Sequence, residues 1–83
     1  MADNQLTVQV LSSSKVFFDG PALVVSGVNK VGPFDILPQH ENFISLLKTE
    51  VIIHCLDGKD LRILCKNGLL EVSEDKVRVF LGI

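Results

Sequence analysis

The sequence predicts an all-β protein: a flattened β-sandwich or barrel of about ten short strands in two sheets. Short segments alternate apolar and polar residues with the period of two that marks a half-buried strand. Clusters of turn-forming residues separate these segments at close intervals. A helical spacing of apolar residues occurs in one segment, which is too short for an isolated helix.

The first half of the chain supplies four candidate strands, at residues 6–10, 16–18, 22–28 and 34–37. Turn formers lie between them, at residues 12–15, 19–21 and 29–33. Gly27 lies inside the third strand and indicates a possible β-bulge. Pro38 has no N–H to donate, so it ends ladder pairing after the fourth strand.

Residues 51–56 and 61–66 are predicted to form a hairpin around Asp57-Gly58, because this dipeptide between apolar runs is a strong hairpin signal. Two cysteines lie in these strands, Cys55 and Cys65. If they face the same side, Ile53 and Ile63 do so too. For these side chains to share one side of the sheet, the hairpin loop must have three or five residues.

The end of the chain continues in the same pattern, with a turn at Asn67-Gly68, a strand at 69–72, a polar turn at 73–76 and a last strand at 77–81. Residues 43–47 allow two interpretations. We expect a short strand, but the spacing of their apolar side chains also suits a helical turn capped by Asn42. The predicted core comprises Leu6, Val8, Val10, Val24, Ile36, Ile63, Leu70, Val77 and Val79.

Length and composition restrict the classes of function. A chain of 83 residues is one domain, spanning residues 1–83, and its apolar fraction of 47% argues against disorder. The net charge is −2 and the basic residues are scattered, so no nucleic-acid partner is expected. Neither a bilayer-length apolar run nor a secretory signal is visible. Any membrane contact is therefore expected to run through a partner.

The residues that could carry chemistry favour structural roles. A thiol–imidazole pair would need Cys55 or Cys65 with His40 or His54, and the adjacent His54 and Cys55 point to opposite faces of a strand. We expect both thiols to be reduced and buried, and His54 to face solvent or a partner. Metal-ligand spacings and glycine-rich phosphate loops are missing from the sequence. We therefore expect no enzyme, no metal, no cofactor and no small-molecule ligand, with a thiol enzyme as the weaker hypothesis.

One stretch is unusual, because residues 32–44 read GPFDILPQHENFI and combine two prolines, a histidine and several apolar residues. This stretch resembles the GEFGILPGHAPLL element of the N-terminal domain of the epsilon subunit of F-type ATP synthase. Further segments are similar to that family in the same order: VFFDG at 16–20, Asp57-Gly58, NGLLEV at 67–72 and KVRV at 76–79. Together they cover nearly the whole chain.

The resemblance implies a ten-stranded flattened sandwich at the foot of the central stalk, which links the gamma subunit to the membrane c-ring and couples proton or sodium flow to ATP synthesis without catalysing a reaction. It also implies a peripheral position on the cytoplasmic face of the inner (plasma) membrane, or the equivalent place in an organelle. The implied interface with the ring or gamma comprises Gly32, Pro33, Phe34, Asp35, His40, Glu41 and Asn42. The alternative function is a free-standing β-sandwich adaptor for another partner, because fold does not fix function.

Three departures from the family stretch bear on the expected interface. Pro33 replaces an acidic residue and Asp35 replaces a glycine, so the acidic contact is expected at Asp35. Gln39 replaces a second glycine, so the backbone turn there must form without one. Family members usually continue into a two-helix domain, whereas this chain stops at Ile83 as either a short member or a truncated piece. From these residues alone we expect no nucleotide-dependent inhibition.

Overall fold

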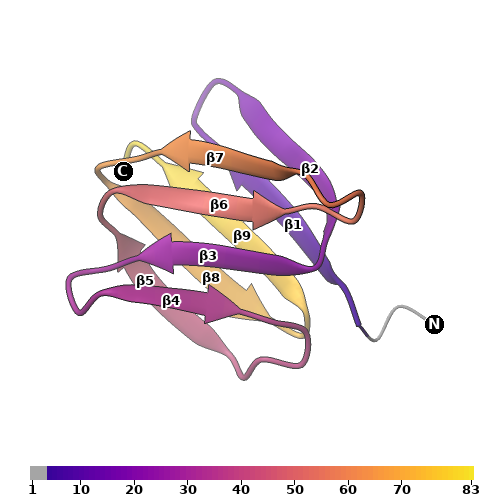
Figure 1. Ribbon diagram of the computed structural model, residues 1–83. Helices are drawn as coiled ribbons and strands as arrows, with labels where there is room; N and C mark the ends of the chain where they lie inside the picture. Colours follow the sequence, from indigo (N-terminus) through magenta and orange to yellow (C-terminus); the bar gives the residue numbers. More distant parts are fainter. Residues whose placement is uncertain (1–3) are drawn as a thin grey trace.

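The computed structural model describes residues 4–83, and these residues form nine strands and no helix (Figure 1). The strands are β1 (Leu6–Leu11), β2 (Val16–Ala22), β3 (Val24–Val28), β4 (Pro33–Ile36), β5 (Phe43–Leu47), β6 (Glu50–His54), β7 (Asp60–Leu64), β8 (Gly68–Ser73) and β9 (Lys76–Leu81). Residues 43–47 are a strand, which decides between the two interpretations that their sequence allowed. The all-β prediction is confirmed.

The strands form two sheets that lie face to face (Figure 1). The five-stranded sheet has the order β2-β1-β9-β8-β5, and the four-stranded sheet has the order β4-β3-β6-β7. All neighbouring strands are antiparallel except β1 and β9, which are parallel and join the two ends of the chain. Edge strands β4 and β5 lie on one side of the sandwich, and edge strands β2 and β7 lie on the other.

The core between the sheets is built from the inward faces of both. Seven residues of the predicted core are at most 1% exposed: Leu6, Val8, Val10, Ile36, Leu70, Val77 and Val79. The prediction for Val24 is wrong, because Val25 points inward and is fully buried. Residues 22–25 are all apolar, so their sequence does not show which of them face the core. The pairing of Val25 with Ile36 and Ile53 determines that Val25 faces inward. Ile63 is only half-buried, although it packs against the core.

The β6–β7 hairpin has a five-residue loop, residues 55–59. Val51 pairs with Ile63 and Ile53 pairs with Leu61, so Ile53 and Ile63 share a face, as the loop-length argument requires. Gly58 has a φ of 87° in this loop, a conformation that glycine adopts readily. The Asp57 carboxylate accepts the Lys59 N–H at 2.9 Å, which stabilises the turn.

The bulge expected at Gly27 is wrong. β3 pairs in regular register with both of its neighbours, and the irregularity lies instead between Val10 and Leu11 of the β1–β2 pair. Gly27 serves a different purpose: a Cβ there would lie 2.8 Å from Cζ of Phe34 and 3.0 Å from Cδ2 of Leu47. The missing side chain makes room for the Phe34 ring.

Candidate functional site

The segment from Gly32 to Asn42 is the partner surface expected from the sequence, and it comprises β4 and the connection to β5. Its entry is a tight turn in which the Asn29 side chain accepts the N–H of Val31 at 2.9 Å and that of Gly32 at 3.2 Å. The Asn29 amide also donates to Ser45 Oγ at 3.0 Å, so the turn is attached to β5. These contacts hold the start of the segment against the sandwich.

The Phe34 side chain points into the sandwich. Its ring is half-buried, packs against the core and lies 5.4 Å from the Phe43 ring in an edge-on arrangement. The half-buried His40 ring also lies edge-on to Phe43, at 5.6 Å between ring centroids. Nδ1 of His40 donates to the Glu41 carbonyl at 2.8 Å, because a carbonyl can only accept. Phe34 and His40 therefore both pack against the Phe43 ring, and Phe34→Ser is expected to cost stability.

Four of the expected interface residues have exposed side chains: Pro33, Asp35, Glu41 and Asn42. Gly32 is half-buried and has a φ of 144°, which favours glycine. The segment therefore presents acidic and polar side chains, together with the exposed apolar Leu37, on a backbone that turns and aromatic packing hold in place.

Gln39 adopts the left-handed conformation expected of the glycine that it replaces, with a φ of 68°. Its N–H donates to Oδ1 of Asp75 at 2.6 Å. Asp75 belongs to the β8–β9 turn, and the sequence did not single it out. Its local setting is a two-residue hairpin turn, in which Glu74 and Asp75 both have positive φ.

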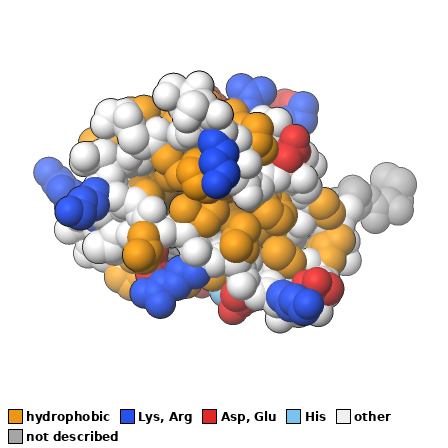
Figure 2. Space-filling view, turned by 90° about the horizontal axis from the view of Figure 1, so that it is seen from above, with side chains coloured by type: hydrophobic (Ala, Val, Ile, Leu, Met, Phe, Trp, Pro, Cys, Tyr) orange, Lys and Arg blue, Asp and Glu red, His pale blue; other side chains and the backbone are white. Residues whose placement is uncertain are grey.

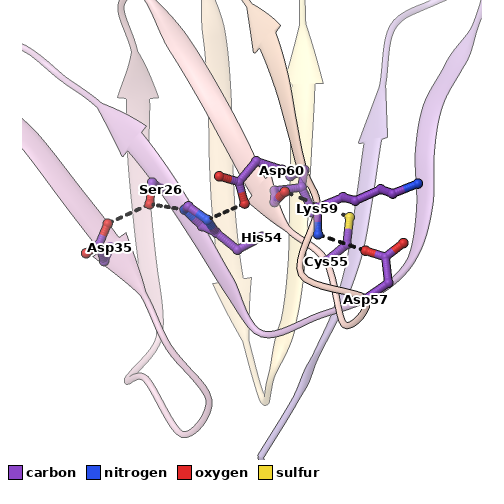
Figure 3. A network of polar contacts seen from close by, with 8 residues as sticks. Ser26, Asp35, His54, Cys55, Asp57, Lys59 and Asp60 are labelled. Carbon is purple, nitrogen blue, oxygen red and sulfur yellow. Dashed lines mark hydrogen bonds and ion pairs between the residues drawn. The ribbon is translucent and has the colours of Figure 1, made fainter.

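A row of polar side chains crosses the outer face of the four-stranded sheet (Figure 3). Ser26 Oγ donates to Oδ1 of Asp35 at 2.7 Å and lies 2.9 Å from Nε2 of His54. Nδ1 of His54 lies 2.9 Å from Oδ1 of Asp60. The four residues come from β3, β4, β6 and β7, so the row connects every strand of the sheet.

The distances within Asp60, His54 and Ser26 match those of a serine-hydrolase triad. The surroundings do not suit nucleophilic catalysis. The Ser26 hydroxyl donates to Asp35, and Ser26 lies in the middle of a regular strand instead of on the sharp turn that exposes a catalytic serine beside backbone N–H donors. The row is therefore a structural hydrogen-bond network, and within it Ser26 orients the Asp35 carboxylate. His54 points outward as expected, but other side chains of this chain already engage its ring.

The two cysteines are not disulfide-bonded; Cys65 is buried and Cys55 is half-buried against the core. Burial raises the pKa of the Cys65 thiol above its ordinary value of 9.0, since an apolar environment disfavours the thiolate. His54 points away from the core toward which Cys55 packs, so these two side chains do not pair. Within residues 4–83, no three His, Cys, Asp or Glu side chains are grouped in a way that could hold a metal ion.

A second surface, along edge strands β2 and β7, is apolar. Figure 2 views this side of the molecule and shows hydrophobic side chains gathered between scattered charges. The large exposed apolar residues on these strands are Val16, Phe17, Leu61 and Leu64, with Leu64 75% exposed. Nζ of Lys15 lies 4.8 Å above the Phe17 ring. We call these four residues the apolar edge.

No helix in the described part of the chain is long and apolar enough to cross a membrane.

Comparison with known proteins gives a consistent result. The family model of the ATP synthase delta/epsilon chain β-sandwich domain matches residues 5–81. The ATP synthase epsilon chain of Corynebacterium aurimucosum is 33% identical over 81 residues, which cover 95% of this chain and 65% of that protein. The epsilon chain of a Sulfurovum species is 31% identical over 72 residues, which cover 86% and 56%. The chain thus spans about two thirds or less of the length of these relatives.

Two solved structures have the same fold. A chain in the Euglena gracilis mitochondrial ATP synthase (OSCP/F1/c-ring) superimposes with a TM-score of 0.86 at 15% identity, over 94% of this chain and 51% of that chain. A chain in the central stalk/c-ring part of the Tetrahymena thermophila mitochondrial ATP synthase gives a TM-score of 0.76 at 9% identity, over 94% and 63%.

Proposed function

The chain belongs to the family of the ATP synthase delta/epsilon chain β-sandwich domain, and on this basis we propose that it is a non-catalytic central-stalk subunit that links the gamma subunit to the membrane c-ring. The observation that carries the proposal is the match of the family model to residues 5–81, nearly the whole chain. In this role the protein transmits rotation driven by proton or sodium flow, and it binds partners instead of converting a substrate.

A linking subunit needs two separate partner surfaces, and the two candidate surfaces of this chain lie on opposite sides of the sandwich. Asp35, Glu41 and Asn42 form the polar surface that we assign to the c-ring. The apolar edge on β2 and β7 suits a permanent partner, since exposed apolar patches on small domains commonly mark protein interfaces. We assign it to the gamma subunit. The protein would then be a peripheral subunit on the cytoplasmic face of the inner (plasma) membrane, or in the equivalent place in an organelle.

Capture from detergent-solubilised membranes tests the c-ring assignment. The immobilised chain should retain both gamma and c-ring. Asp35→Asn with Glu41→Gln removes two charges with little change of shape and should reduce c-ring recovery while gamma recovery persists. The control, Asp19→Asn with Glu74→Gln, removes the same charge at exposed positions elsewhere and should leave both unchanged. Equal recovery by the two double variants would contradict the c-ring surface.

Leu64→Lys tests the gamma assignment, because it puts a charge into the apolar edge at a side chain that contributes little to the core. Recovery of gamma should fall without a change in melting temperature. If the wild-type chain captured neither gamma nor c-ring, the central-stalk proposal would be wrong and the free-standing adaptor would replace it.

A further inference from the structure

We infer that Asp75 is a positioning residue that sets the shape of the c-ring loop, residues 37–42, through its hydrogen bond to the Gln39 backbone. The contact joins Oδ1 of Asp75 to the N–H of Gln39 at 2.6 Å, across 36 positions of sequence. Its consequence for c-ring binding rests on the proposed function, whereas its effect on the loop is a property of this chain alone.

The backbone on both sides of this contact is in a conformation that non-glycine residues rarely adopt. Gln39 has a φ of 68°, and Glu74 and Asp75 have φ values of 50° and 64°. Such residues persist only where surrounding contacts hold them. The Gln39 side chain is exposed to solvent, whereas its backbone N–H donates to the Asp75 carboxylate. The Asp75 carboxylate is therefore the group that holds Gln39 in place.

Asp75 is a firm attachment point. It lies in the turn that joins β8 to β9, where Ser73 pairs with Lys76. Its carbonyl also accepts the N–H of Thr7 at 2.9 Å, which connects the turn to β1. The backbone of Asp75 is held by β8, β9 and β1 of the five-stranded sheet, so its carboxylate is firmly placed beside the loop that joins β4 of the other sheet to β5.

The hydrogen bond between Asp75 and Gln39 lies directly before the proposed binding residues in the sequence. Residue 40 follows Gln39, donates its own N–H to the Leu37 carbonyl at 3.2 Å and leads into Glu41 and Asn42. With Gln39 held, these side chains point in fixed directions before a partner arrives, so less conformational freedom is lost on binding. The prediction is that loss of the Asp75 carboxylate loosens the loop and weakens binding while the sandwich remains folded.

Amide hydrogen exchange of the isolated chain tests the loop directly. Asp75→Gly removes the acceptor and keeps a residue that hairpin turns of this type favour, so the protein should fold. Exchange at Gln39 should become about tenfold faster, as expected for loss of a hydrogen bond to a charged group. Asp75→Asn keeps an oxygen acceptor and should stay near the wild-type rate. Glu74→Gly changes the neighbouring turn residue and should leave exchange at Gln39 unaltered.

Binding to purified, detergent-solubilised c-ring tests the consequence. Asp75→Gly should weaken affinity by about tenfold, with Asp75→Asn and Glu74→Gly close to wild type. Unchanged exchange at Gln39 in Asp75→Gly would overturn the positioning role whatever the partner. Faster exchange with unchanged c-ring affinity would overturn the link to binding. A wild-type chain that binds no c-ring would overturn the proposed function, and faster exchange would still support the positioning role of Asp75.

Discussion

Replacing Gly27 by alanine should destabilise the sandwich, because the added methyl group has no room. Its Cβ would lie 2.8 Å from Cζ and 3.2 Å from Cε2 of Phe34, and 3.0 Å from Cδ2 of Leu47. Leu47 is 1% exposed and cannot move out of the core, so the half-buried Phe34 ring must shift. Overpacking of this kind costs roughly 1–3 kcal/mol.

Part of this cost is offset, because alanine restricts the unfolded chain and thereby stabilises by about 0.4–1 kcal/mol at a compatible backbone. The net expectation is a loss of about 1–2 kcal/mol, or roughly 5–15 °C in melting temperature for a domain of this size. The change in the free energy of unfolding is measured by urea titration, with far-ultraviolet circular dichroism as the probe. Gly20→Ala is the matched control, since its Cβ would meet only Phe18, at 3.7 Å and 3.9 Å, and it should stabilise slightly.

A double-mutant cycle separates overpacking from any general effect of alanine. Phe34→Leu removes the ring atoms nearest to Gly27, so Gly27→Ala should cost about 1 kcal/mol less in that background than in the wild type. Gly27→Ala as stable as Gly20→Ala, or strictly additive effects of Gly27→Ala and Phe34→Leu, would refute the packing argument.

Three further predictions follow from single positions. Val79→Asp buries a carboxylate at a fully buried site and should cost several kcal/mol by urea unfolding, on the order of the whole domain stability, whereas Lys76→Asp on the same strand should change little. Gln39→Gly relieves the strain of a left-handed backbone conformation, so it should raise the free energy of unfolding by about 0.5–1 kcal/mol and raise the melting temperature. A lower melting temperature would contradict that reasoning. Because burial raises the pKa of Cys65, the folded chain holds its proton where the unfolded chain loses it, so stability should fall as pH rises above 9.0. Cys65→Ala should flatten that fall, and in native thiol labelling at constant pH Cys65 should react more slowly than Cys55.

Much of the fold follows from local sequence pattern. In residues 6–10 and 76–79 apolar and polar side chains alternate, so the sequence alone shows that each of these strands has one face toward the core and one toward solvent. The burial of Val8, Val10 and Val79 was predictable for this reason. The Asp57-Gly58 turn was equally visible, because it needs a positive φ that glycine supplies. The resemblance of residues 32–44 to a known family also singled out Glu41 and Asn42, whose side chains are exposed.

The tertiary structure decided what the local pattern leaves open. Residues 22–25 are all apolar, so only pairing of β3 with β4 and β6 made Val25 the inward residue. Phe34 turned inward because Gly27, on the neighbouring strand, leaves space for its ring. The contacts of Ser26 with His54 and of Gln39 with Asp75 span 28 and 36 positions. Strand register arises from burial of whole sheet faces at once, so no short segment carries the information that brings such residues together.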